Sequence, residues 1–234
     1  MVIWLSVCGV FFFLAYLLGS FPTGYILGKL LKGIDIREVG SGSTGATNVL
    51  RTLGKGPGAF VLLVDCLKGV LAINLVDALF NLAPQYINYN FIPENLDVQI
   101  WQPLLVTLLG SAAILGHSKS IFLGFTGGKS VATSLGILLA MNWQVGLATF
   151  GVFLIVIASS KIVSLSSISG AVAVSILMIL FKQPLAYILF SVAGSLYVII
   201  RHRSNIERLL AGTEAKIGQK VEVKSQTSEV MTNQ

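Results

Sequence analysis

Residues Pro57–Leu82 read PGAFVLLVDCLKGVLAINLVDALFNL, and this apolar run decides the fold class. A helix that crosses the hydrocarbon core of a bilayer needs about 20 mostly apolar residues, and this run is long enough. Hydrophobic residues make up 54% of the chain and charged residues 11%, against about a quarter charged in an average soluble domain. The sequence therefore predicts an all-α, polytopic integral membrane protein.

Further apolar runs extend this prediction to about seven transmembrane helices. The first run, Val2–Leu31, is interrupted at Gly19–Pro22 and is too long for a cleaved secretion signal, so we interpret it as a retained, kinked helix. Val131–Ser159 is interpreted as a hairpin of two helices that turns at residues 142–144, with one long helix as the alternative. The other predicted spans are Trp101–Leu115, Lys161–Phe181 and Pro184–Ile200.

The distribution of basic residues favours the hairpin. With it, the positive-inside rule holds, because nearly all Lys and Arg of the loops face the cytoplasm and only Lys182 lies outside. The N-terminus is then outside and the C-terminus cytoplasmic, while residues 83–99 form an outer loop without Lys or Arg. The net charge of +6 thus belongs to basic loops and does not indicate nucleic-acid binding. Residues 1–218 are predicted to form one transmembrane domain, and residues 219–234 a disordered cytoplasmic tail.

Three polar islands lie between the apolar runs, and the first is Gly40–Arg51, GSGSTGATNVLR. Its glycines allow the backbone to turn and to expose N–H groups. Donor side chains without a carboxylate among them suit an anion, and above all a phosphate. A flexible linker is the alternative, but a linker does not need the Thr-Asn-x-x-Arg that follows. The candidate donors are Ser41, Ser43, Thr47, Asn48 and Arg51.

The second island, Gly116–Thr133, reads GHSKSIFLGFTGGKSVAT. Its Gly127-Gly128-Lys129-Ser130 is similar to the end of a Walker A loop, but position 123, where that motif needs glycine, is Leu. No strand–helix unit surrounds it either, so the sequence excludes a P-loop NTPase. Glycine N–H groups and one lysine before a predicted helix still indicate a phosphate site.

The third island, Arg201–Gly218, reads RHRSNIERLLAGTEAKIG. Arg201 and Arg203 are interpreted as topology anchors that bind anionic lipid. The remaining polar residues exceed what anchoring requires, and the spacing of Asn205 and Arg208 places both on one helical face. These candidate site residues are His202, Asn205, Arg208 and Glu214.

Other charged and reactive residues leave open alternatives. Asp65 and Lys68 share one face of a predicted span, either as a structural ion pair or as part of the site. Cys8 and Cys66 lie in apolar runs and are expected to be core residues, and no metal cluster or nucleotide motif is found. From these residues alone, a transporter or channel for a phosphorylated anion is an alternative to an enzyme, although no internal repeat supports it.

Together the islands resemble the motifs of the bacterial acyl-phosphate:glycerol-3-phosphate acyltransferases. The first resembles GSGNxGATNxxR, with Ser43 in place of Asn. The second resembles GHxFPxFLxFKGGKGVAT, with four departures at Lys119, Ser120, Thr126 and Ser130. The third resembles HxxNxxRLxxGxE throughout, and the Asp65, Lys68 and Gly69 trio also matches.

This resemblance implies a bacterial inner-membrane enzyme with its active site on the cytoplasmic side. It would transfer an acyl group from acyl phosphate to the 1-hydroxyl of sn-glycerol 3-phosphate, the first acylation step of phospholipid synthesis. Lysophosphatidic acid and phosphate would be the products. Because an acyl phosphate is already activated, neither a cofactor nor a covalent nucleophile is implied. The implied partners are the two substrates, the bilayer and the enzyme that supplies acyl phosphate.

The resemblance also suggests roles for individual residues. The implied catalytic residues are Arg51, His117, Lys129 and His202. The proton of the attacking hydroxyl is taken either by one of the histidines or by a substrate phosphate, whose second pKa of about 6 makes it a competent base. The implied phosphate- and substrate-binding residues are Ser41, Ser43, Thr47, Asn48, Lys68, Gly127, Gly128, Ser130, Asn205, Arg208 and Glu214.

Overall fold

The computed structural model describes residues 1–82 and 92–218, and within these ranges the chain forms helices, turns and loops without a strand. The first apolar run divides into α1 (Val2–Ser20) and α2 (Thr23–Lys32). Phe21 leaves the helical region at φ −56° and ψ 118° because the ring of Pro22 disfavours a helical residue before it. The predicted interruption of this run is therefore confirmed.

The second span begins two residues earlier than the sequence suggests, and the third is longer at both ends. The second comprises α4 (Lys55–Asp77) and a π-helical turn, η1 (Ala78–Leu82), and the third is α6 (Val98–Ser118). Val98 and Gln99, predicted to be loop, are the first turn of α6, because the Asp97 side chain accepts a hydrogen bond from the Gln99 N–H and caps the helix. Residues 83–91 of the predicted loop lie outside the described ranges.

The hairpin prediction for the fourth apolar run is confirmed. Helix α7 (Val131–Met141) ends where Asn142 adopts an extended conformation, and α8 (Trp143–Ser160) begins directly after it. The Asn142 side chain accepts a hydrogen bond from the Val145 N–H at 3.0 Å and so caps α8. Three further helices follow, α9 (Val163–Leu180), α10 (Leu185–Arg201) and α11 (Arg203–Leu210), with a bend of 61° between the last two.

Five helical segments of the described chain are long and apolar enough to cross a membrane, and α10 with α11 makes a sixth if the bent pair counts as one. Helix α7 is apolar but has only 11 residues. The total of seven spans and the orientation of the termini therefore stay predictions. The predicted tail, 219–234, lies outside the described residues.

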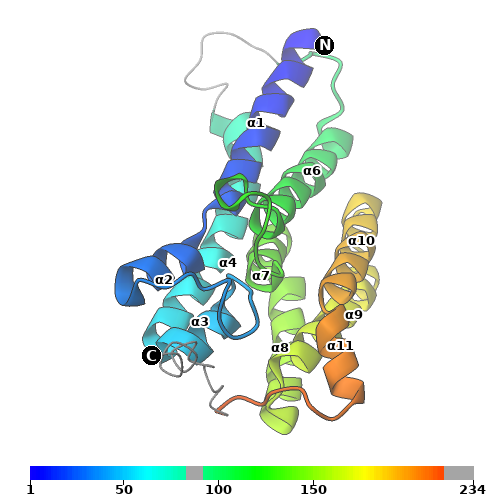
Figure 1. Ribbon diagram of the computed structural model, residues 1–234. Coiled ribbons are helices and arrows are strands. Elements are labelled where there is room, and N and C mark those ends of the chain that lie inside the picture. Colours follow the sequence, from blue (N-terminus) through cyan, green and yellow to red (C-terminus); the bar gives the residue numbers. More distant parts are fainter. Residues whose placement is uncertain (83–91, 219–234) are drawn as a thin grey trace, which may run out of the picture.

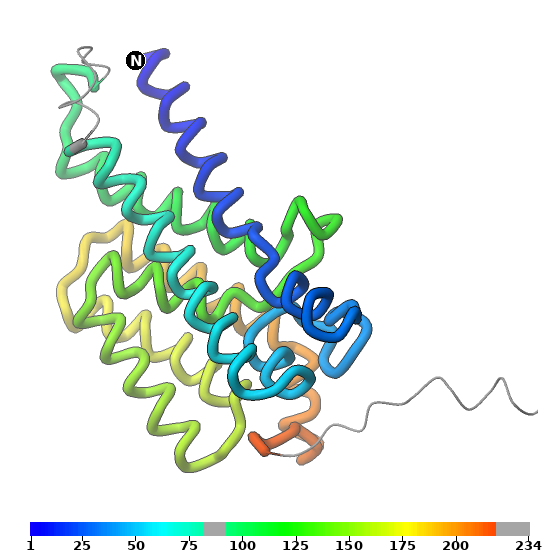
Figure 2. Tube along the Cα trace, turned by 90° about the vertical axis from the view of Figure 1, so that its left-hand side faces the viewer, coloured from blue at the N-terminus to red at the C-terminus, as the bar shows by residue number. Residues whose placement is uncertain are grey.

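The helices pack as two groups joined by α7 (Figure 2). Helices α1, α4 and α6 lie side by side, α8, α9 and α10 form the second group, and α7 packs against both α4 and α8. The α4–α7 crossing is close because it is built on glycine: a Cβ on Gly136 would overlap the carbonyl oxygen of Cys66, and one on Gly69 that of Thr133. Small residues of this kind let membrane helices approach until their backbones touch.

The first and third polar islands lie in the half of the molecule away from the N-terminal end of α1 (Figure 1). The first forms a loop and a short helix, α3 (Ala46–Leu53), beside α2, and the third forms α11. The first residues of α1 lie at the opposite end. The apolar core between α1, α4 and α6 fixes these positions, with Trp4, Ala72 and Leu109 fully buried in it.

Candidate active site

The first island is a loop that its own Asn48 holds together. The Asn48 side chain is 1% exposed, its amide nitrogen lies 2.9 Å from the carbonyl oxygens of Ile36 and Ser43, and its oxygen accepts from the Ser41 N–H at 2.9 Å. Gly40, at φ 60°, closes the turn, where a Cβ would strike the Asn48 side chain. Asn48 thus shapes the loop that precedes α3.

A cavity of about 470 Å³ connects this loop with the centre of the helix bundle. Its polar end is lined by residues of all three islands, among them Ser41, Arg51, Lys129 and Asn205. Its other walls are apolar side chains of α7, α8, α9 and α10. One cavity therefore offers both cationic donors and a hydrocarbon-like interior.

The second island places its glycines and lysine directly before α7. The Gly128 N–H donates to the carbonyl of His117 at 3.1 Å, and a Cβ on Gly128 would overlap the His117 ring. Ser130 has φ 60°, a left-handed conformation that costs a serine more than a glycine, and its hydroxyl donates to the Ile114 carbonyl at 3.0 Å. This left-handed conformation at position 130 explains why the resembled motif has a glycine there.

Lys129 belongs to a polar network with the third island. Its Nζ donates to Oδ1 of Asn205, whose nitrogen donates to Oε1 of Glu214 at 2.6 Å. Glu214 also accepts from the Ser164 hydroxyl at 2.8 Å and from Arg208 Nε at 2.6 Å. Burial lowers the pKa of Lys129 to about 8. Burial raises the pKa of Glu214, but its hydrogen bonds outweigh that effect and leave this pKa below its usual value.

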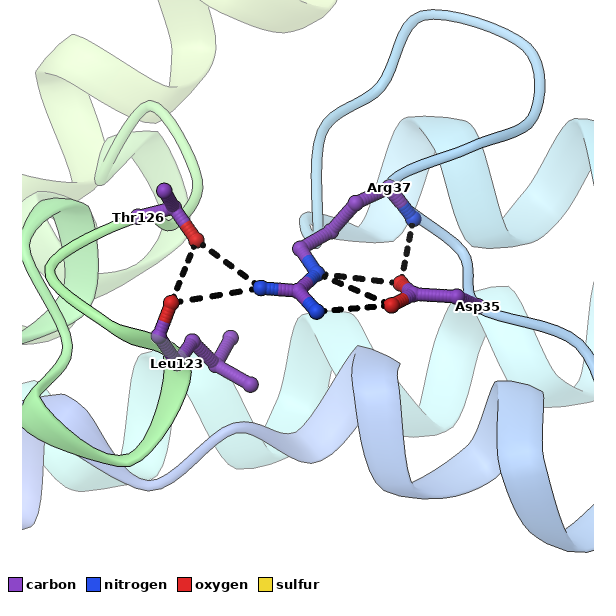
Figure 3. A network of polar contacts seen from close by, with 4 residues as sticks. All are labelled: Asp35, Arg37, Leu123 and Thr126. Atoms are coloured by element: carbon purple, nitrogen blue, oxygen red, sulfur yellow. Dashed lines mark hydrogen bonds and ion pairs between the residues drawn. The ribbon is translucent and has the colours of Figure 1, made fainter.

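Arg37 links the first and second islands (Figure 3). Its guanidinium pairs with the Asp35 carboxylate at 2.7 Å, and its Nη1 donates to the Leu123 carbonyl and the Thr126 hydroxyl, each at 3.2 Å. The Arg37 hydrogen bond holds the pKa of Asp35 below its usual value. Thr126 is the position where the resembled motif has a lysine, and here it accepts a hydrogen bond from a neighbouring cation.

Two further arginines form hydrogen bonds between the islands. Arg51 of the first island donates to the Ala215 carbonyl of the third at 3.1 Å. Arg201 donates to the Gly128 carbonyl of the second at 3.0 Å, a contact that its predicted role as a lipid anchor does not require. Arg203 is exposed and pairs with Glu207 alone among the described contacts.

The two histidines have different surroundings. His117 lies beside Asp65, with 3.7 Å between Nδ1 and Oδ1, and Asp65 also pairs with Lys68 at 2.8 Å. Nδ1 of His202 lies 2.7 Å from the Val198 carbonyl, which can only accept, so Nδ1 carries the hydrogen and Nε2 is left as an acceptor. Both rings line the cavity.

Comparison with known proteins identifies the family. The family model described as glycerol-3-phosphate acyltransferase matches residues 9–212. The chain belongs to the glycerol-3-phosphate acyltransferase family. It is 76% identical to the glycerol-3-phosphate acyltransferase of Trichormus variabilis over 97% of this chain and 99% of that one. It is 57% identical to that of Acaryochloris marina over 94% and 96% of the two chains.

A solved acyltransferase of this family has the same fold. The glycerol 3-phosphate form of PlsY (YgiH), an integral membrane glycerol 3-phosphate acyltransferase, superposes with a TM-score of 0.76 at 35% identity. This match covers 91% of the present chain and 96% of the other. The lysophosphatidic acid form of that protein gives a TM-score of 0.74 at 34% identity. As a member of this family, the present chain is a membrane-embedded acyltransferase.

Most residues suggested by the acyltransferase motifs line the cavity. These are Ser41, Ser43, Thr47, Asn48, Arg51, His117, Lys129, Ser130, His202, Asn205 and Glu214. Four others do not line it. Lys68 forms an ion pair with Asp65 and donates a hydrogen bond to the Phe21 carbonyl. Gly127 and Gly128 belong to the turn of the loop before Lys129. Arg208 donates a hydrogen bond to Glu214.

Sequence reasoning missed three polar residues of this acyltransferase. Asp35 and Arg37 join two islands, and Ser164 donates to Glu214 from the first turn of α9. Asp35 and Arg37 stand two apart just before the first island, a spacing that does suggest a local ion pair. Ser164 has no such signal, because a serine near the start of an apolar run is ordinarily unremarkable in sequence.

Proposed function

We propose that this chain transfers an acyl group from an acyl phosphate to the 1-hydroxyl of sn-glycerol 3-phosphate. The products are lysophosphatidic acid and inorganic phosphate, and the reaction is the first acylation step of phospholipid synthesis. The observation that carries the proposal is the single cavity with a cationic, donor-rich end and an apolar body. The cationic end suits two phosphates, and the apolar body suits an acyl chain.

The side chains around the cavity favour an activated acyl donor. Neither Cys8 nor Cys66 lines it, and the Ser164 hydroxyl is committed to Glu214. Among the described residues that line the cavity, we find no serine hydrogen-bonded to a histidine, as a covalent acyl-enzyme route would need. An acyl phosphate is a mixed anhydride and needs no such nucleophile, which supports it as the donor.

The reaction balances with the two substrates alone. The 1-hydroxyl oxygen forms a bond to the acyl carbon, and the bond from that carbon to the phosphate oxygen breaks. The phosphate leaves with the electron pair, and the hydroxyl proton is transferred to a phosphate oxygen. The protein holds the two anions close together and stabilises the charge that develops between them.

The three islands divide this work in the proposal. Arg51, with Ser41 and Thr47, binds one phosphate, and Lys129 at the N-terminus of α7 binds the other, where the helix dipole favours negative charge. Asn205 and His202 orient glycerol 3-phosphate. Nε2 of His202 is the acceptor available to the 1-hydroxyl, and a substrate phosphate is the final base.

The membrane orientation is part of the same proposal. The islands face the cytoplasm of a bacterial inner membrane, where glycerol 3-phosphate and the enzyme that supplies acyl phosphate meet the site. The many basic residues at this end support that orientation. Single cysteines at Lys182 and Ile217 in a cysteine-free chain test it, since a membrane-impermeant maleimide should label only the first in intact cells.

The decisive experiment is acyl transfer by the purified protein in detergent micelles. Labelled glycerol 3-phosphate is supplied with palmitoyl phosphate or palmitoyl-CoA, without added metal, and lysophosphatidic acid is counted. Product from the acyl phosphate alone is expected. Product from the thioester alone would contradict the proposed donor, and product from neither by folded protein would contradict the reaction.

Two variants locate the reaction in this cavity. Lys129→Ala removes the cation before α7, and we expect a loss of at least a hundredfold in kcat/KM. Lys182→Ala removes an exposed cation outside the cavity and is expected to keep the rate within twofold. Equal rates for both variants would place the chemistry elsewhere.

A further inference from the structure

The cavity has one polar end and one apolar end. Along α9 its lining begins at Ser164, which contacts Glu214, and ends at Val174. Along α10 it runs from Phe190 to His202, in the opposite chain direction. Both helices therefore line the cavity from its polar end to its apolar end, and the length of either lining segment gives the depth of the cavity.

Leu138 and Val174 line the apolar end, and they pack in one buried cluster with Val145 and Met178; we call these four side chains the floor. Val145 and Met178 are fully buried, and neither borders the cavity. Tyr187 and Ile188 of α10 pack against the same floor. Hydrocarbon that enters from the polar end therefore meets close-packed protein at this depth.

The depth corresponds to a definite length of hydrocarbon. Ser164 and Val174 are about 15 Å apart along α9, and Phe190 and His202 about 18 Å along α10, at 1.5 Å per helical residue. An extended acyl chain gains about 1.25 Å per methylene, the projection of a C–C bond of about 1.5 Å. The two helices therefore span about 12 to 14 C–C bonds, which is a chain of about 13 to 15 carbons.

We propose that the floor limits the length of acyl chain that this enzyme transfers to about 15 carbons. The inference rests on the proposed function, because it places the acyl chain of the donor in this cavity. In a bilayer the donor's chain is already among hydrocarbon, so each added methylene gains little by entering the protein. A chain that is too long must displace packed side chains, and this overpacking is what discriminates.

A substitution at Gly170 can test this limit on chain length. It lines the cavity one helical turn before Val174, and the nearest atoms to a Cβ placed there belong to Thr149 at 3.7 and 3.8 Å. A methyl group would therefore fit, and a leucine side chain would extend into the space that the acyl chain occupies. One turn of α9 is about 5.4 Å, or four to five methylenes.

The experiment measures kcat/KM of the full chain, in detergent micelles, for saturated acyl phosphates of 8 to 20 carbons. The wild type should use chains up to about 15 carbons at similar rates, and its rate should fall at least tenfold at 20 carbons. Gly170→Leu should move this fall to about 11 carbons and leave the 8-carbon rate within threefold. Val172→Leu, on the exposed side of α9, is the matched control and should keep the wild-type profile.

A second variant tests the limit from the other direction. Met178→Ala opens the floor and should raise the rate with the 20-carbon donor at least fivefold relative to the 16-carbon donor. An unchanged profile in both variants, or an equal loss at every length in Gly170→Leu, overturns the inference but leaves the proposed reaction standing. A wild-type chain that uses no acyl phosphate of any length overturns both.

Discussion

Lys129 and Asn205 meet at the polar end of the cavity, with the Lys129 ammonium donating to the amide oxygen of Asn205. The first residue comes from the loop before α7 and the second from α11, so the contact joins two islands that are far apart in sequence. The neutral amide of Asn205 orients the Lys129 ammonium, whereas a carboxylate in its place would neutralise the charge. A cation held in this way keeps its charge for an anionic ligand.

The lowered pKa of Lys129 predicts a pH dependence. Burial brings that pKa to about 8, so the ammonium is present below pH 8 and is lost as pH rises through that value. Phosphate binding should therefore weaken above pH 8, by up to about tenfold per pH unit. The measurement is KM for glycerol 3-phosphate and for the acyl phosphate between pH 7 and 9.5, and the KM of the substrate whose phosphate contacts Lys129 should rise. Lys129→Arg, which stays charged throughout, should flatten the rise, and a flat wild-type profile would contradict the prediction.

Glu214→Gln is expected to loosen the third island. The carboxylate accepts from Ser164, Asn205 and Arg208, and the glutamine cannot satisfy all three donors. We expect a loss of about 1–2 kcal/mol in stability and at least a tenfold fall in kcat/KM. Thermal unfolding in one detergent and the acyltransfer assay measure the two effects. Glu207→Gln, whose ion pair with Arg203 is exposed, should change neither, and equal effects of the two variants would argue against the network.

The glycine crossing of α4 and α7 predicts a steep steric effect. Gly136→Ala would place its methyl group on the Cys66 carbonyl oxygen, and backbone on both sides resists movement. A loss of about 3 kcal/mol, or failure to fold, is expected. Gly151→Ala, on α8 with no atom within 4 Å of its Cβ, should be neutral or stabilise by up to about 1 kcal/mol. Thermal unfolding of the two variants in the same detergent tests this prediction, and similar unfolding midpoints would contradict the close crossing of α4 and α7.

Arg37→Gln should separate the first two islands. The guanidinium bonds Asp35 on one side and the Leu123 carbonyl and Thr126 hydroxyl on the other, and glutamine cannot span them. We expect KM for the donor to rise about fivefold or more while unfolding changes by less than about 1 kcal/mol, since the side chain is one-third exposed. Thr126→Val should have a smaller effect, because Leu123 still accepts.

Steady-state kinetics with Arg203→Gln as the control measure this contribution. That arginine is exposed and lies outside the cavity, so its variant should match the wild type. A KM for Arg37→Gln within twofold of the wild type would mean that the second island holds its shape without the first.

Local chemistry explains what the sequence could predict. Pro22 and Asn142 interrupt apolar runs through covalent geometry and capping, effects that act within a few residues, and both breaks occur where expected. The apolar runs likewise identify the spans, because lipid requires a continuous hydrophobic surface. The motif residues of the islands were found because short donors and glycines are unusual between two such runs.

The remaining features depend on contacts between distant segments. Nothing near Ser164 in the sequence indicates that it will meet Glu214, and the contact exists only because α9 and α11 pack together. Arg201 stands among basic residues at the end of an apolar run, as a membrane anchor would, but in the folded chain it donates to the Gly128 carbonyl of a distant segment. Asn48 has the donors of a ligand-binding residue, yet those donors shape its own loop.

The shortness of α7 has a consequence for the lifetime of the donor. Its 11 residues extend about 16 Å, roughly half of a hydrocarbon core of about 30 Å, so the helix and the loop before it cannot both reach opposite membrane surfaces. With the islands on the cytoplasmic side, as proposed, α7 ends within the hydrocarbon, and its side chains Val131, Leu135 and Leu138 form an apolar wall of the cavity. In the proposed reaction this wall would keep water from the mixed anhydride until the hydroxyl of glycerol 3-phosphate arrives. The same shortness that weakens α7 as a membrane span would thus favour transfer of the acyl group over its loss to water.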